Sequence, residues 1–266
     1  MNPSLPWPYI FFLMVVATKS SSPCPFGMSL INASQGLSPY CIDIFEATIE
    51  AQLPGENETW TLNAYNMNLD SLDVSGTPYR AAIPKPWVQQ SLFTTERTEK
   101  PQAYISQVQA RRACGTASKR LCSLAEYRTA CGGMAANATY PYGNTYQPGW
   151  CNTGHPNPVT IIFGPTAKFN SVEMNNPVLV TLEDTVAYSA GKYAKCTQPS
   201  PDTATLDQAG SLDEWVDDVT MSGHGVFAGG YFVDDAINGP GCLYRTIAHV
   251  PTYHDYSLGF RCCKDM

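Results

Sequence analysis

Ten cysteines are the residues of this chain with the greatest capacity for chemistry. A thiolate can act as a nucleophile, bind a soft metal ion or form a disulfide. The 266 residues contain no Cys-x-x-Cys pair and only four His, so the spacing does not favour zinc. An even number of cysteines favours disulfides, but ten allow roughly 945 complete pairings and spacing alone cannot choose among them. Cys262 and Cys263 are neighbours whose side chains would point to opposite faces of a strand, so we expect them to bond to two different partners.

Histidines and carboxylates near the C-terminus are the other candidates for chemistry. His249, His254 and Asp255 lie close together in the chain, with Asp234 and Asp235 upstream. Two His and one carboxylate could bind iron in a facial-triad site. The alternative is the ordinary polarity of a surface loop. No Ser-His-Asp or paired-carboxylate arrangement predicts another type of catalysis.

The N-terminal residues have the pattern of a secretory signal. Residues 10–17 form an apolar run of eight, which suits the core of a signal peptide and is too short to span a bilayer. The alternative is a short buried strand. We expect residues 1–22 to be a signal peptide and the rest of the chain to be exported to an oxidising compartment, namely the extracellular space, the ER lumen or the periplasm. No later apolar run approaches the ~18 residues of a membrane helix, so no membrane span is expected.

The charge balance limits the partners. Only 15% of the residues are charged and the net charge is −7. Nucleic acids and anionic membranes are bound through Lys/Arg patches, so neither is expected as a partner. Three Asn-x-Ser/Thr sequences, at Asn32, Asn57 and Asn137, predict glycosylated surface loops, although each could also occur by chance.

Two helices and several strands must position these residues. Ser106 is a suitable N-cap for a helix that reaches Ala113 or Gly115. A second helix is predicted from Ser123 to Ala130, because Ser123 and Glu126 match a capping box. The double glycine at 132–133 should end it.

The remaining elements are short. Tyr40–Thr48 alternates in part between apolar and polar residues, which predicts a half-buried strand. Residues 52–100 are expected to be loop with short strands, and short strands are also predicted at Val159–Phe163 and Val178–Leu182. Residues 242–263 should form a strand, a loop and a final strand. Residues 23–266 contain no repeat and no linker, so we predict one domain.

Several blocks, taken in order, resemble a known family. They are Cys41–Thr48, Ser106–Gly133 with its Lys-Arg-Leu turn, Tyr140-Pro-Tyr-Gly-Asn144, Gly210-Ser-Leu-Asp-Glu-Trp215, Gly229-Gly230-Tyr-Phe and Leu258-Gly-Phe-Arg-Cys262. The ordered set is similar to the formylglycine-generating enzyme, or sulfatase-modifying factor, family. The resemblance implies an α+β domain related to the C-type lectin fold, with little regular secondary structure and with disulfides that hold it together.

The resemblance also implies structural calcium. The family's main calcium loop uses side-chain oxygens and backbone carbonyls, the ligands that a hard cation prefers. The matching positions are Asp207, Gly210, Leu212 and Glu214. A second site would begin at Asn152 and Thr153, although its other ligands do not align. The alternative for the first loop is a cap beside an acidic surface patch.

Disulfide pairs follow from the same resemblance. The family's bonds imply Cys114–Cys262 and Cys131–Cys242. For the other six cysteines we expect Cys24–Cys41, Cys122–Cys263 and Cys151–Cys196.

The catalytic cysteines of the family have no counterpart here. Their positions fall on Asp234 and Gly239, and neither residue can replace a thiolate as copper ligand and nucleophile. Copper chemistry is therefore not expected. We predict a calcium-stabilised binding module that holds a peptide or a glycan. The alternative is an oxidoreductase of this family, generating formylglycine or carrying out another metal-dependent oxidation.

Overall fold

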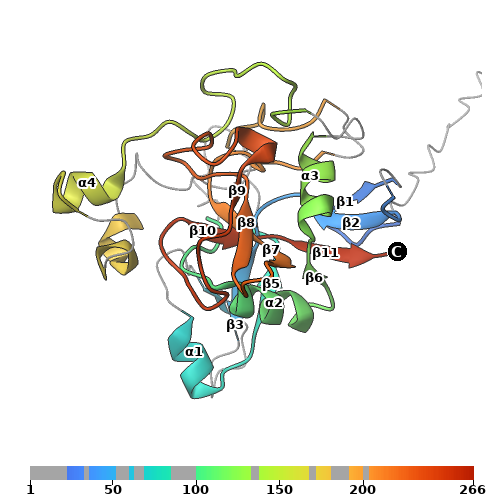
Figure 1. The fold of residues 1–266 in the computed structure, drawn as a ribbon. Helices are drawn as coiled ribbons and strands as arrows, with labels where there is room; N and C mark the ends of the chain where they lie inside the picture. The colour runs from blue at the N-terminus through green and yellow to red at the C-terminus, as the bar shows by residue number, and fades with distance from the viewer. Residues whose placement is uncertain are drawn as a thin grey trace, which may run out of the picture.

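Three small sheets form the frame of the domain. The computed structural model describes residues 23–32, 36–51, 60–62, 69–84, 100–132, 138–167, 172–180, 192–199 and 204–266. Within these ranges the strand orders are β1-β2-β11-β6, β10-β7-β8-β9 and β4-β3-β5 (Figure 1). The strands are β1 Met28–Ile31, β2 Tyr40–Asp43, β3 Thr48–Ala51, β4 Trp60–Leu62, β5 Tyr79–Ala82, β6 Arg120–Leu121, β7 Asp213–Val219, β8 Gly225–Ala228, β9 Arg245–Thr246, β10 Leu258–Phe260 and β11 Cys262–Asp265.

The helices are short, and much of the described chain is turn or loop. The helices are α1 Asp70–Ser75, α2 Gln107–Thr116, α3 Leu124–Gly132 and α4 Pro158–Phe163, with 3₁₀ turns η2 Val172–Asn175, η3 Pro177–Val180 and η4 Gly241–Leu243. This mixture is the α+β, loop-rich architecture that the resemblance implied.

Capping residues define the two main helices. Ser106 Oγ accepts from the Gln109 backbone N–H, and the Gln109 side chain accepts from the Ser106 backbone N–H. Ser123 and Glu126 form the same reciprocal pair at the start of α3. Both predicted helix starts are confirmed, and α3 continues to Gly132. Each capping box satisfies two backbone donors that the first helical turn leaves without partners.

The main core lies between α2 and the strands of the second and third sheets. Trp215 of β7 is buried at its centre, packs edge-on against Phe227 at 4.9 Å, and donates from Nε1 to the Ile105 carbonyl at 2.9 Å. Because the indole N–H has a partner, the largest side chain of the core is buried without an unsatisfied donor. This contact fixes β7, the strand that carries Glu214, against the start of α2.

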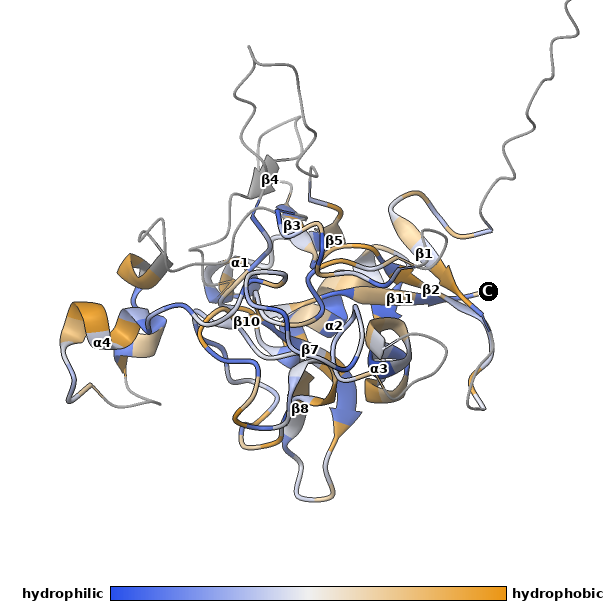
Figure 2. Ribbon diagram, turned by 90° about the horizontal axis from the view of Figure 1, so that it is seen from above, coloured by the Kyte–Doolittle hydropathy of each residue, from blue (hydrophilic) through white to orange (hydrophobic). Residues whose placement is uncertain are grey.

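Two predicted strands are helical instead. Val159–Phe163 belongs to α4, where the Asn157 side chain accepts from the Val159 N–H at 2.9 Å and Pro158 occupies the first turn. Figure 2 shows α4 as a hydrophobic segment at the edge of the molecule. Val178–Leu182 was also predicted as a strand, but its described part lies in η3. The prediction failed because a short run of branched apolar residues has no period that separates strand from helix.

The predicted strand Tyr40–Thr48 is divided in two. Residues 44–47 bend between β2 and β3, so the chain passes from the first sheet to the third. The bend places Glu46 in the interior rather than on a strand face, and its side chain is buried. The C-terminal residues form β10 and β11 as expected, in two different sheets.

Five disulfides join all ten cysteines. The pairs are Cys24–Cys41, Cys114–Cys262, Cys122–Cys263, Cys131–Cys242 and Cys151–Cys196. The neighbours Cys262 and Cys263 therefore bond to α2 and to the turn before α3, respectively. A native disulfide typically contributes roughly 2–5 kcal/mol in a small secreted domain.

No helix in the described part of the chain is long and apolar enough to cross a membrane. The predicted signal peptide lies outside the described residues. Asn32 is exposed, as a glycosylated residue must be, while Asn57 and Asn137 also lie outside the described ranges.

Candidate functional site

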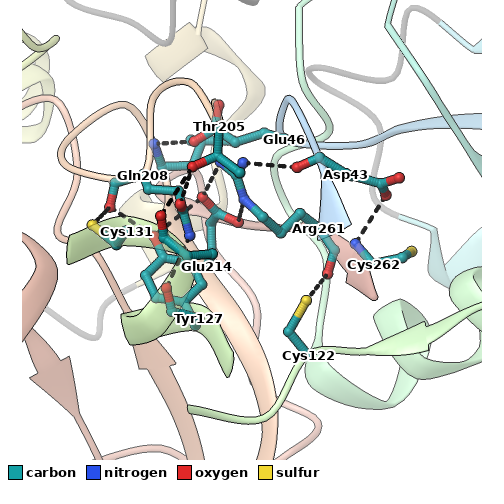
Figure 3. Close-up of polar contacts among 12 residues, drawn as sticks. Asp43, Glu46, Cys122, Tyr127, Cys131, Thr205, Gln208, Glu214, Arg261 and Cys262 are labelled. Atoms are coloured by element: carbon teal, nitrogen blue, oxygen red, sulfur yellow. Dashed lines mark hydrogen bonds and ion pairs between the residues drawn. The ribbon is translucent and has the colours of Figure 1, made fainter. Parts of the chain in front are cut away.

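A buried ion pair lies where three of the blocks that resemble the family come together. Arg261, between β10 and β11, donates from Nε to Glu214 Oε2 at 2.6 Å and from Nη2 to Glu214 Oε1 at 2.7 Å (Figure 3). The side chains are 1% and 0% exposed. Two parallel bonds of this kind fix the orientation of the carboxylate on β7.

The rest of the guanidinium binds backbone carbonyls. Nη1 donates to Asp43 and Ile44, both at 3.2 Å, and Nη2 donates to Leu206 at 3.0 Å. Arg261 therefore connects the end of β2, the segment before the predicted calcium loop, and β7. Its pKa is raised because the attraction of Glu214 outweighs the effect of burial.

Two more carboxylates face this pair. Glu46 accepts from the Leu212 N–H at 2.9 Å and from Ser211 Oγ at 3.1 Å. Burial raises the pKa of Glu46 well above its ordinary value, and the charges of Glu214 and Asp207 raise it further. The Arg261 guanidinium thus faces the carboxylates of Glu214 and Glu46, and the charge of Asp207 acts on Glu46. When all three carboxyls ionise, these four side chains carry an excess of two negative charges.

The positions implied for calcium lie beside this acidic cluster. The excess negative charge is what a doubly charged ion would balance. The predicted second site lies beside the first, because the Asn152 carbonyl accepts from the Ser211 N–H at 2.8 Å and a side chain on Gly210 would overlap that carbonyl. Asn152 is buried, and its Oδ1 and Nδ2 have no hydrogen-bond partner among the described residues. A buried amide oxygen without a donor is a suitable ligand for a hard cation.

Three of the four residues predicted for the main calcium loop are linked through Glu46, which accepts from the Leu212 N–H and feels the charges of Glu214 and Asp207. The carboxylate of Glu214 is already engaged. Both oxygens of Glu214 already accept from Arg261. A carboxylate offers about four lone-pair sites, so Glu214 retains capacity for a cation. Asp207, Gly210 and Leu212 would supply the other oxygens, with Asn152 and Thr153 alongside.

The positions of the family's catalytic cysteines hold a turn. The Asp234 carboxylate accepts from the Ala236 N–H at 2.9 Å and from the Ile237 N–H at 3.2 Å. Gly239 has a positive φ of 109°. Cys242, the one cysteine of this segment, is bonded to Cys131. The segment therefore offers carboxylate and backbone groups, and no thiol.

Carboxyl and phenol side chains surround the turn at residues 234–239. Asp213, the first residue of β7, is buried, and burial followed by the charges of Asp255 and Asp234 raises its pKa well above the ordinary value. Burial, with help from the charges of Asp213 and Asp234, also raises the pKa of Tyr231 and of Tyr244 above the ordinary value. The surroundings of the turn are thus acidic and aromatic, and they favour the protonated form of Asp213.

The predicted iron ligands are not brought together. His249 stacks on Tyr253 at 3.9 Å and lies against Phe227 at 5.8 Å, and burial lowers its pKa. His254 instead approaches Asp70, with Nε2 and Oδ2 3.8 Å apart. Across the described ranges, no group of three or more His, Cys, Asp or Glu side chains is arranged to hold a metal ion. In this structure His249 and His254 therefore do not share a site with a carboxylate as a facial triad would require.

Glu46, Arg261 and Asp213 are not among the site residues predicted from the sequence. Each lies inside one of the segments that resemble the family, but only the fold brings the three segments together. A usable signal was present, since Arg261 stands between Phe260 and Cys262, and a charge within an apolar run is rarely buried without a partner.

The fold and this site define a class of protein: an α+β, disulfide-linked domain of C-type lectin type with a buried Glu–Arg pair. The Sulfatase-modifying factor enzyme 1-like domain matches residues 45–266, and the chain belongs to this family. The crystal structure of CarF has a TM-score of 0.52 and 13% identity, covering 88% of this chain and 89% of that one. PvdO from Pseudomonas aeruginosa has a TM-score of 0.47 and 14% identity, covering 91% of each chain. No curated protein sequence matches this chain.

Proposed function

We propose that this protein is an exported, calcium-stabilised binding module of the sulfatase-modifying factor family that lacks copper and cysteine oxidase activity. One observation supports this most directly: every cysteine is in a disulfide, so no thiolate is available. The family's chemistry needs a thiolate both as metal ligand and as nucleophile. The five disulfides also suit an oxidising compartment.

The ligand would be a peptide or a glycan held at the acidic, aromatic surface around Asp234. Partly exposed Tyr231 and the carboxylate of Asp234 offer a flat hydrophobic face and hydrogen-bond acceptors. Aromatic rings with a polar rim are a common means of holding such ligands. Immobilised peptides and glycans would show binding that Tyr231→Ala weakens. Phe26→Ala, at a distant side chain that is 93% exposed, should leave it unchanged.

The loss of activity has a direct test. The purified protein is incubated with a Cys-containing sulfatase peptide, copper and oxygen, and aldehyde is measured by hydrazide labelling. We expect none. Formation of aldehyde would overturn the binding-module proposal and establish the oxidoreductase alternative.

The calcium part has a separate test. A ligand present at about 100 times its Kd stabilises a fold by roughly 2.7 kcal/mol, so EGTA should lower the melting temperature measurably. Asp207→Asn should abolish this response, whereas Asp217→Asn, at an exposed carboxylate, should keep it. An EGTA response of zero in the unmodified protein would remove calcium from the proposal.

A further inference from the structure

An aromatic cluster follows α3 and has no role in the site described above. Tyr140 and Tyr142 are stacked, with ring centroids 5.5 Å apart and planes 4° from parallel. Tyr146 lies 5.7 Å from Tyr140, and Trp150 packs edge-on against Tyr142 at 4.9 Å. Four aromatic rings within one segment of the chain thus pack into one cluster, in which Tyr140 is buried and Tyr146 is exposed.

Covalent and backbone contacts hold the cluster in place. Tyr140 and Gly143 exchange backbone hydrogen bonds of 2.9 and 3.0 Å, which closes a tight turn. Tyr142 packs against the Cys151–Cys196 disulfide. Tyr140 lies over Gly241, where a side chain would come within 2.6 Å of a ring carbon. The cluster is therefore fixed before any ligand arrives.

A buried carboxylate lies next to these rings. Asp235 is 6% exposed, and its backbone carbonyl accepts from the N–H of Gly241, the residue beneath Tyr140, at 2.7 Å. Thr153 hydrogen-bonds to this carboxyl, whereas Oδ2 has no hydrogen-bond partner among the described residues. Burial raises the pKa of Asp235, and a bound cation would favour its ionised form. Burial raises the pKa of Tyr140, and the charge of Asp235 raises it further; the same two causes apply to Tyr146. The carboxylate is thus close enough to act on the phenols.

The cluster already holds one ammonium group at its rim. Lys195 Nζ lies 5.3 Å from the centre of the Trp150 ring. A cation within about 6 Å of an aromatic face is attracted by the ring's electron density. The rings of Tyr140, Tyr142 and Tyr146 differ from Trp150 in two ways. They have a carboxylate nearby, and no cation lies over them among the described contacts.

We propose that Asp235 and the rings of Tyr140, Tyr142 and Tyr146 bind an ammonium group, either a lysine side chain or a quaternary ammonium. The inference deepens the proposed function and rests on it in treating the domain as a binding module. Tyr146 is 44% exposed, so a ligand meets this ring first, and rotation of its side chain opens the way to Oδ2. The positive group then lies against the rings, with its charge balanced by the carboxylate.

The chemistry of the site selects an organic cation. An anion would be repelled by Asp235. A divalent metal needs several oxygen ligands, whereas the side facing the rings offers one free carboxylate oxygen, Oδ2 of Asp235, among phenol rings. Rings and a single carboxylate are the groups that recognise ammonium ions.

Calorimetric titration with choline and with N-acetyl-lysine methylamide tests the proposal and separates the two sources. Neutral 3,3-dimethylbutanol has the shape of choline and should bind at least about tenfold more weakly, because it lacks the charge. Asp235→Asn and Tyr146→Ala should each weaken binding of the better cation by about tenfold. Asp217→Asn, an exposed carboxylate elsewhere, should not.

Equal binding of choline and its neutral isostere would overturn the proposal. Cation binding that Tyr146→Ala leaves unchanged would also overturn it, because Tyr146 is exposed and its replacement leaves the core intact. Competition by calcium for the same site would also overturn it, by placing a metal at Asp235. Because peptide or glycan binding is tested at Tyr231, failure of the amine site leaves that result intact, and the two failures are distinguishable.

Discussion

Replacing Arg261 is the most demanding test of the buried network. Arg261→Gln removes both bonds to Glu214 and the bonds to three backbone carbonyls. Breaking a buried ion pair by removing one partner costs about 3–5 kcal/mol, because it leaves an uncompensated charge. Here Glu214 would also face the carboxyls of Glu46 and Asp43, which raises the cost rather than lowering it. Domains are stable by only about 5–15 kcal/mol, so this is a large fraction of the total.

Urea unfolding with intact disulfides measures the loss in the free energy of unfolding. In a thermal melt, a loss of about 3–5 kcal/mol in a chain of this size corresponds to a fall in melting temperature of about 6–20 °C. Arg111→Gln is the matched control, since Arg111 pairs with Asp217 at the surface and both side chains are exposed, at 38% and 52%. Such a pair contributes roughly 0–1 kcal/mol.

A double variant separates charge from shape. Arg261→Gln with Glu214→Gln removes both charges and should be more stable than Arg261→Gln alone. A loss for Arg261→Gln no greater than that of the Arg111 control would refute the reasoning, since it would mean that the buried carboxylates need no counter-charge. Equal stability of the single and double variants would contradict the electrostatic origin of the loss.

Three further predictions concern other parts of the fold. Burial acts to raise the pKa of Glu126, but the Arg120 guanidinium and the cap of α3 outweigh it and lower the pKa. Its stabilisation is therefore present above pH about 4.5 and is lost as pH falls through the lowered value. Glu126→Gln should cost about 1–3 kcal/mol in urea unfolding at pH 7, and the difference should shrink in acid; a pH-independent difference would contradict this. Gly241→Ala should destabilise the fold more than Gly223→Ala, because both have positive φ but only the first would drive a methyl group into the Thr139 carbonyl; equal melting temperatures would count against the close approach. Thiol titration of the unfolded, unreduced protein should detect no free thiol and, after reduction, ten; any free thiol at the start would reopen the cysteine chemistry.

Local sequence signals predicted α2 and α3 correctly but misassigned a short apolar run as a strand. The capping residues Ser106 and Ser123 located α2 and α3 because an N-cap acts through bonds to the next three residues. Val159–Phe163 was misassigned, although Asn157 and Pro158 before it are a helix start. The apolar, β-branched run was given more weight than the two residues that decide its conformation.

The candidate site needed contacts between distant residues. Glu46 reaches Leu212 across 166 positions, and Arg261 reaches Asp43 across 218. No local pattern contains such pairs. The blocks could be recognised and ordered from the sequence, but their mutual geometry could not. The charges of Glu46 and Arg261 interact strongly only when the fold buries both side chains and excludes water.

The segment of residues 234–242 is held by a disulfide and has no thiol at the two positions where the family's catalytic cysteines would fall. Cys131–Cys242 fixes the segment that carries Asp234 to α3, and the Asp234 carboxylate then closes a turn within that segment. A cysteine at position 234 alone would not restore copper chemistry, because its partner position is Gly239, whose positive φ disfavours a side chain. Two changes and a relaxed backbone would be needed together. The frame of the family is therefore retained here with carboxylate and aromatic side chains around Asp234, and the proposed binding role rests on them.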